Sequence, residues 1–172
     1  IYVKEASPAK PEVYGSVEVG SSLETDPLEP RSPYSSSKAG SDLIALSYHS
    51  TYGAPVLVTR CTNNFGPYQH PEKAIPLFTT NLLAGRSIPL YGDGLNERDW
   101  LYVEDHCAAV HLVLEQGQVG EIYNVGAGNE TANRVMVDLL LQLTGRGEEL
   151  VTYVEDRLGH DRRYSVDISK IT

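Results

Sequence analysis

The sequence has few cysteines and no excess of basic residues. Cys61 and Cys107 stand far apart, and no set of His, Cys, Asp and Glu residues has metal-ligand spacing. We therefore expect no metal site, and the two cysteines suit a reducing compartment. The net charge of −9 argues against nucleic acid or an acidic membrane surface as a partner.

Long apolar segments are also absent. The chain has no run of about 18 apolar residues, and its first residues lack the basic-then-apolar pattern of a signal peptide. We therefore expect a soluble cytoplasmic protein with no membrane partner. Its 172 residues, 41% of them hydrophobic, are enough for one domain with a real core. Both ends look cut, because residues 1–3 read as a strand and residues 167–172 as the first turn of a helix, so we expect a fragment of a longer protein.

The segment 34–52 is predicted to be a helix. Pro33 suits the first helical turn, and Gly53 supplies a stop. Tyr34 and Lys38 are four residues apart and therefore lie on one face. A cation near a phenol lowers its pKa, and such a tyrosine can exchange a hydroxyl proton near neutral pH, as hydride transfer from an alcohol requires. Taken alone, the pair is more often an exposed one on a solvated face.

Helices and apolar strands alternate after this segment, which is typical of a parallel doubly wound sheet. Ligands bind at the carboxyl ends of such strands. Asn63 and Asn64 follow the predicted strand 55–60 and are therefore candidate ligand contacts, or else they cap turns. The further predictions are helices 74–84 and 133–144, a helix ending near Gly117, and strands 87–91, 121–125 and 150–154.

Two positively charged stretches stand out in this acidic chain. Arg98, beside the only tryptophan, could clamp a phosphate with its guanidinium fork, or could form a surface pair with Asp99. The segment 156–164 holds three arginines and a histidine, which favours an anionic ligand such as a diphosphate, although a solvated charge run has the same composition. The glycines in 126–130 lack nucleotide-binding spacing and predict a tight turn.

The chain resembles the dTDP-glucose 4,6-dehydratases, which are extended short-chain dehydrogenases/reductases, from about residue 12 to its end. The likeness rests on the order and spacing of Tyr34 and Lys38 and of the segments 63–68, 98–106 and 156–164. It implies the carboxyl-terminal part of an NAD(P)-binding Rossmann-like doubly wound parallel sheet with a smaller α/β substrate-binding lobe. Residues 1–62 would form a partial Rossmann domain. Residues 63–172 would form mainly the substrate lobe, interleaved with returning Rossmann segments.

The resemblance also implies an activity. NAD would be the cofactor, dTDP-glucose the substrate and a homodimer the full-length assembly, in deoxysugar biosynthesis for antibiotics. Tyr34, aided by Lys38, would take the C4 hydroxyl proton while hydride passes to NAD, and Glu12 would remove the C5 proton. Tyr34, Lys38 and Asn64 would hold the cofactor. The residues that would hold the sugar nucleotide are Asn63, Lys73, Ala74, Ile75, Pro76, Leu77, Phe78, Pro89, Leu90, Tyr91, Arg98, Asn133, Asp156, Arg157, Leu158, Gly159 and His160.

The sequence departs from the family pattern in three ways. Lys10 and Pro11 stand where the family has Thr and the Asp that protonates the C6 hydroxyl, which proline cannot do. The glycine-rich turn that binds the NAD pyrophosphate is missing, and Leu158 replaces a proline. Two alternatives therefore stay open. One is another nucleotide-sugar short-chain dehydrogenase, such as a 4-epimerase or decarboxylase, which would not need Glu12. The other is a sugar-nucleotide-binding fragment that alone neither retains NAD nor turns over dTDP-glucose.

Overall fold

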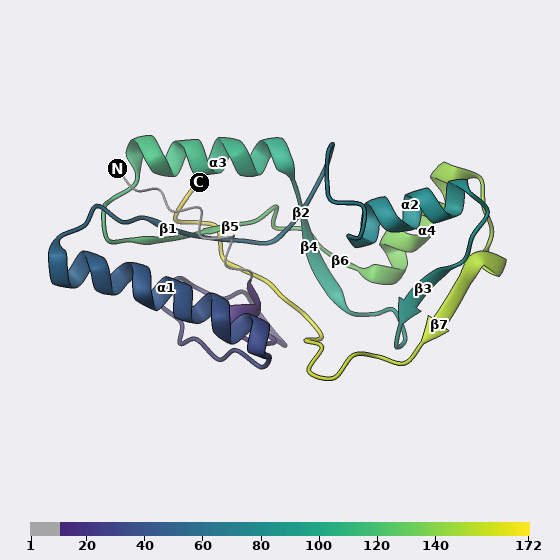
Figure 1. Ribbon diagram of the computed structural model, residues 1–172, viewed down its shortest axis with the longest axis horizontal. Coiled ribbons are helices and arrows are strands. Elements are labelled where there is room, and N and C mark those ends of the chain that lie inside the picture. The colour runs from purple at the N-terminus through teal and green to yellow at the C-terminus, as the bar shows by residue number, and fades with distance from the viewer. Residues whose placement is uncertain (1–10) are drawn as a thin grey trace.

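The computed structural model describes residues 11–172 and has two lobes (Figure 1). The strand predicted at residues 1–3 and Lys10 lie outside the described residues. In the first lobe, two strands pair in parallel, with one long helix on each side of them (Figure 1). This lobe contains α1 (Pro33–Tyr52), β1 (Val58–Cys61), α3 (Val103–Gln116) and β5 (Ile122–Val125), and the short 3-10 helix η1 (Pro11–Val13) contacts α1.

The second lobe packs two helices against another parallel strand pair. Its elements are α2 (Ala74–Leu83), β3 (Ile88–Tyr91), α4 (Asn133–Thr144), the 3-10 helix η2 (Glu148–Leu150) and β7 (Val151–Val154). Apolar side chains at helical spacing on α2 and α4 meet the inward side chains of β3, which explains why this lobe holds the larger apolar core. The buried members of this core are Phe78, Leu82, Ile88, Leu90, Met136, Val137, Leu140 and Leu141.

A three-stranded sheet lies between the lobes (Figure 1). Its central strand β4 (Glu97–Tyr102) pairs in parallel with β2 (Asn63–Phe65) and antiparallel with β6 (Glu130–Ala132). The strand β4 runs directly into α3, so the chain passes from the second lobe to the first at this point. The C-terminal segment also returns to the first lobe, where Val166 forms a bridge with Ser22 (Figure 1). The proposed division at residues 62 and 63 stays a prediction.

The ends of α1 explain why the helix carrying Tyr34 forms where the sequence predicts it. Ser32 and Ser35 cap each other at the first turn, with the Ser35 amide donating to the Ser32 hydroxyl at 3.1 Å. Gly53 ends the helix in a left-handed conformation with φ of 64°, which costs a glycine little. The predicted helix is therefore confirmed within one residue.

The α/β class with parallel strands is confirmed, and the differences concern short elements. The strand predicted at 55–60 begins only at Val58, and the strands β2, β4 and β6 were not predicted. The final residues form a single turn, in which the Thr172 amide donates to the Ile168 carbonyl at 3.3 Å. None of the helices in residues 11–172 is both long enough and apolar enough to cross a membrane.

Candidate active site

A pocket of about 640 Å³ lies between the two lobes. Its wall on the first lobe comes from Tyr34 of α1 and from the carboxyl end of β1, where the chain continues into β2. The second lobe contributes α2, β3 and the start of α4, and the loop after β7 closes one end. The residues predicted to bind ligand that line this pocket are Tyr34, Asn63, Asn64, Lys73, Ala74, Leu77, Phe78, Pro89, Leu90, Tyr91, Asn133, Arg157 and His160.

Buried polar atoms along the pocket lack hydrogen-bond partners within the described residues. They are the Thr62 hydroxyl, the side-chain carbonyls of Asn64 and Gln69, and the Trp100 indole nitrogen, and all four side chains line the pocket. A buried polar atom left unpaired costs about 1–3 kcal/mol. These acceptors and the one indole donor therefore fit a ligand rich in hydroxyl and amide groups, such as a nicotinamide nucleotide or a sugar nucleotide.

Tyr34 presents its phenol to the pocket with the side chain of Lys38 beside it. The Lys38 ammonium lies over the ring, 5.4 Å from its centroid. Burial raises the pKa of Tyr34, and the charges of Glu12 and Cys61 raise it further. The expectation that Lys38 lowers this pKa is therefore wrong for the structure as it stands, because the ammonium faces the ring rather than the hydroxyl. A positive charge close to the hydroxyl is what this tyrosine still needs to act as a base near neutral pH.

Glu12 lies on η1, which contacts the helix carrying Tyr34. The Glu12 side chain is half-buried and does not line the pocket, but its charge is among the causes that raise the pKa of Tyr34. The two predicted catalytic groups are therefore within electrostatic reach of each other. Pro11 opens η1. Proline has neither a backbone N–H nor an acidic side chain, so this position lacks the proton donor of the family pattern.

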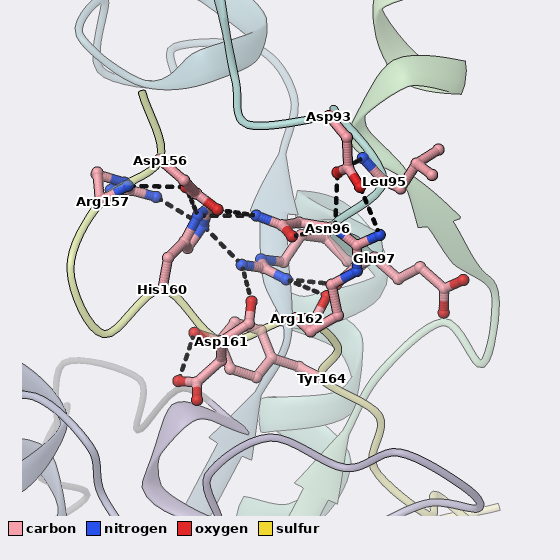
Figure 2. Close-up of polar contacts among 11 residues, drawn as sticks. Asp93, Leu95, Asn96, Glu97, Asp156, Arg157, His160, Asp161, Arg162 and Tyr164 are labelled. Carbon is pink, nitrogen blue, oxygen red and sulfur yellow. Dashed lines mark hydrogen bonds and ion pairs between the residues drawn. The ribbon is translucent and has the colours of Figure 1, made fainter. Parts of the chain in front are cut away.

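The other end of the pocket is organised around His160, which Figure 2 shows among charged neighbours. Its Nδ1 lies 2.6 Å from an Asp156 carboxylate oxygen, and its Nε2 lies 2.8 Å from Arg98 Nη2 and 2.9 Å from Arg157 Nη2. Because guanidinium groups only donate, Nε2 accepts from the two arginines, and Nδ1, which also lies 2.8 Å from the Asn96 amide nitrogen, carries the proton that Asp156 accepts. Burial lowers the pKa of His160, and the charges of Arg157 and Arg98 lower it further, whereas Asp156 raises it. His160 is thus a neutral hub rather than a cation.

Arg98 sits beneath this end of the pocket and is only 5% exposed. It donates to the carbonyls of Glu97 at 2.6 Å and Asp161 at 2.8 Å, and its guanidinium lies 4.2 Å from the Tyr164 ring centroid. The alternative of a surface pair with Asp99 is wrong. Asp99 is buried as well, and its carboxylate accepts hydrogen bonds from the backbone amides of the loop after β5.

A family model described as GDP-mannose 4,6 dehydratase matches residues 7–172. The chain belongs to this family. It is 60% identical over 159 residues to a dTDP-glucose 4,6-dehydratase of Streptomyces antibioticus, covering 92% of this chain and 48% of that relative.

Solved structures give the same result. The dTDP-glucose 4,6-dehydratase DesIV of Streptomyces venezuelae, solved with NAD bound, is 57% identical with a TM-score of 0.92, covering 94% of this chain and 50% of that one. The corresponding enzyme of Bacillus anthracis, solved in complex with NAD, is 54% identical with a TM-score of 0.89, covering 94% and 52%. The resemblance read from the motifs is thereby confirmed. The chain spans about half the length of the curated relatives it matches.

Some of the residues predicted to form the site do not line the pocket. Ala74, Leu77 and Phe78 share one face of α2 and line the pocket, whereas Ile75 and Pro76 lie at other helical phases and do not. Ile75 packs only on the apolar core, whereas Ala74, Leu77 and Phe78 contact both the core and the pocket. Lys38, Glu12, Arg98, Asp156, Leu158 and Gly159 also lie outside the pocket lining.

Leu158 is fully exposed and Gly159 adopts a left-handed conformation with φ of 68°, so this part of the predicted segment forms the turn that carries its neighbours. Asp156 acts through His160, because its carboxylate accepts the Nδ1 proton. Sequence reasoning missed some lining residues. The missed residues are Thr62, Gln69, His70, Glu72, Trp100 and Met136. The amide-rich loop and the single tryptophan were visible signals for some of them.

Proposed function

We propose that this chain is part of an NAD-dependent dTDP-glucose 4,6-dehydratase, which converts dTDP-glucose to dTDP-4-keto-6-deoxyglucose. The observation that carries the proposal is a single pocket with Tyr34 at one end and Arg157 with His160 at the other. One end suits proton transfer from a sugar hydroxyl, and the other suits a diphosphate. The high identity to dTDP-glucose 4,6-dehydratases supports this substrate.

At the first end, Tyr34 takes the proton of the C4 hydroxyl. NAD, when bound, accepts the hydride from C4 and later returns it to C6. Tyr34, Lys38 and Asn64 would hold this cofactor, and the unpaired side-chain carbonyl of Asn64 is available to a donor on it. Because the pKa of Tyr34 is raised in the structure, a shift of the Lys38 ammonium from the ring toward the hydroxyl would stabilise the phenolate.

Glu12 then removes the C5 proton, which the ketone at C4 makes acidic, and returns a proton to C5 when the hydride is delivered to C6. The C6 hydroxyl leaves with a proton, and the family resemblance assigns that proton to an acid at position 11. Proline has no proton to give. Pro11 therefore supports a second role, in which this form of the protein binds the sugar nucleotide without completing the dehydration.

At the far end, Arg157 supplies the exposed charge for the diphosphate. Its guanidinium has few ties to protein, donating to His160 and lying 5.2 Å from the ring centroid of Tyr91. Asn133 at the start of α4 offers further polar contacts. The apolar wall for the sugar and the base is supplied by Ala74, Leu77 and Phe78 of α2 and by residues 89–91 of β3.

We also propose a homodimer and a cytoplasmic enzyme of deoxysugar biosynthesis, including the deoxysugars of antibiotics. Large apolar side chains stand exposed along α1, which supports self-association through this helix. The product, a 4-keto-6-deoxy sugar nucleotide, is the chemical starting point for deoxysugars. Relatives from Streptomyces species support this setting. The exposed side chains are Leu43, Ile44, Tyr48 and Tyr52.

The deciding experiment assays the protein that contains this chain for 4-keto-6-deoxy sugar formed from dTDP-glucose with NAD. The protein with Pro11 is compared with a Pro11→Asp variant. We expect turnover in the variant and a loss of about 10²- to 10⁴-fold with proline, as expected when a positioned acid is removed. Binding of dTDP-glucose with no turnover in either form would leave the binding role, and turnover of a different nucleotide sugar would refute the proposed substrate.

A further inference from the structure

Asp42 extends the face of α1 that carries the proposed catalytic pair. It lies four residues beyond Lys38 and eight beyond Tyr34 and, although charged, is only 1% exposed. One carboxylate oxygen accepts from Arg60 Nε at 2.9 Å, and the other has no hydrogen-bond partner within the described residues. Burial raises the pKa of Asp42, and the charges of Arg60 and Lys38 oppose that rise. The carboxylate is thus tied electrostatically to both β1 and the ammonium of Lys38.

Arg60 connects this carboxylate to the segment that carries Glu12. While Nε donates to Asp42, Nη1 of the same guanidinium donates to the Tyr14 hydroxyl at 2.6 Å, and the group lies 4.8 Å from the Tyr14 ring centroid. Tyr14 lies two residues after Glu12. Because a guanidinium is planar and its donors are fixed in direction, the positions of Asp42 and Tyr14 are fixed relative to each other.

The network continues into the sheet of the first lobe. The Tyr14 hydroxyl donates to the Asn124 side-chain carbonyl at 2.9 Å, and the Asn124 amide group donates to the Ser22 carbonyl at 2.9 Å. Asn124, on β5, is fully buried. Burial raises the pKa of Tyr14, which keeps its hydroxyl protonated and able to donate. Each central group of the network therefore has a partner on a different segment of the chain.

The helix η1 is a single turn, and apolar packing of Val13 and Tyr14 with Ala39 holds it against α1 without fixing the direction of polar side chains. Its own backbone ties are one bond from the Gly15 amide to the Glu12 carbonyl at 3.3 Å and one from the Glu29 amide to the Val13 carbonyl at 2.9 Å. Neither bond connects it to α1. Within residues 11–172, the hydrogen bonds from Arg60 to Tyr14 and to Asp42 form the polar connection between the Glu12 segment and the helix that carries Tyr34 and Lys38.

We propose that Asp42, Arg60 and Tyr14 are positioning residues that hold Glu12 in register with Tyr34 and Lys38. The inference rests on the proposed function, in which Tyr34 and Glu12 act in turn on neighbouring carbons of one bound sugar. A misplacement of about 1 Å can cost a reaction about 10²-fold. The network serves the second step most directly, because Tyr14 is joined to the segment of Glu12 whereas Tyr34 is held by the capped helix itself.

The test is Tyr14→Phe in the protein that contains this chain. Position 11 carries whichever residue, proline or aspartate, supports turnover. The substitution removes one hydroxyl and leaves the ring in place. The matched control is Tyr123→Phe, which removes a buried hydroxyl that accepts from the Gln118 amide at 2.8 Å and has no link to η1 or α1. Rates are measured with dTDP-glucose carrying deuterium at C4 or at C5, together with amide hydrogen exchange of residues 12–15.

In Tyr14→Phe we expect kcat to fall about 10- to 100-fold with KM within about twofold, since geometry rather than binding is disturbed. The isotope effect from C5 rises, because proton removal by Glu12 becomes limiting, and the amides of residues 12–15 exchange faster. Tyr123→Phe lowers the melting temperature to a similar degree without either change. Isotope effects and exchange in Tyr14→Phe equal to those of the control would overturn the proposal.

A second variant covers the case in which Tyr14→Phe does not fold. Asp42→Asn keeps an acceptor for Arg60 but removes the charge, and we expect the same rise in the C5 isotope effect. An unchanged C5 isotope effect in a folded Asp42→Asn protein also contradicts the network. If the protein with an intact network turns over no dTDP-glucose with either proline or aspartate at position 11, the proposed function fails. The exchange of residues 12–15 then still decides whether the network orders the Glu12 segment.

Discussion

The two ends of the pocket are supported in different ways. Behind Tyr34, the supporting groups are buried charges and amides, with Arg60 only 2% exposed and Asn124 fully buried. Behind Arg157, the outer support consists of solvent-exposed pairs, such as Arg162 with Asp93, whose side chains are 53% and 55% exposed. Among the arginines at this end, only Arg98 is deeply buried.

This difference corresponds to what each end would do in the proposed reaction. Proton transfer depends steeply on geometry, and buried networks with fixed donors hold geometry best. Recognition of a diphosphate depends on charge and a few forked contacts, which a solvated loop can still provide. Exposed pairs contribute little to stability, so the loop from Asp156 to Arg162 can adjust to a ligand at low cost.

The largest effect should come from Tyr34→Phe, which tests the chemical end directly. We expect kcat to fall about 10²- to 10⁴-fold, because the group that exchanges the C4 hydroxyl proton is removed. The affinity for dTDP, measured by calorimetry, should stay within about twofold, because the diphosphate end is untouched. The control is Tyr68→Phe, which removes a fully exposed hydroxyl outside the pocket lining and should leave both values unchanged. More than a tenth of the original kcat in Tyr34→Phe would break the comparison.

A smaller effect should come from Arg157→Ala at the anionic end. Hydrogen bonds to charged groups contribute about 1.5–3 kcal/mol, so the dissociation constant for dTDP should rise about 10- to 150-fold. The matched control is Arg162→Ala, five residues further on, where the guanidinium pairs with Asp93 at 2.7 Å and does not line the main pocket. Equal losses in the two variants would show that affinity depends on the overall charge of the loop rather than on a placed arginine.

The sequence was informative about features that depend on near neighbours. Pro33 and Gly53 predicted the bounds of α1, and helical phase explains which residues of α2 reach the pocket. The partnership of Asp42 with Arg60 could not be predicted. Arg60 ends an apolar segment, Asp42 lies on a helix of mixed polarity, and only the folded chain brings them to 2.9 Å.

The strands of the middle sheet could not be predicted from local patterns either. The strand β4 contains Arg98, Asp99 and Trp100 and shows no clear apolar alternation. Its buried charges are stabilised by hydrogen bonds to residues distant in the sequence, which local patterns do not reveal. The direction of the Tyr34 pKa was missed for a related reason. Spacing places Lys38 near Tyr34, but it does not say whether the ammonium faces the ring or the hydroxyl.

The smallest effect concerns the pH dependence of stability at the anionic end. The pKa of His160 is lowered by burial, so the unfolded chain binds this proton more readily than the folded one. The free energy of unfolding should therefore be highest above about pH 6.5, the ordinary value for histidine, and should fall as the pH drops through the lowered pKa. His106, whose pKa is also lowered by burial, adds to the same trend.

His160→Gln should flatten this dependence without abolishing it, when the urea midpoint of the protein containing this chain is followed from about pH 7 to about pH 5. Glutamine can accept from the two arginines and donate to Asp156, yet it does not titrate. His111→Gln, on the exposed face of α3, is the control and should leave the slope as it is. If His160→Gln leaves the slope unchanged, His160 is protonated equally in both states, and the neutral hub between Arg98 and Arg157 is wrong. A flattened slope instead shows that the anionic end, too, depends on one buried group beneath its exposed pairs.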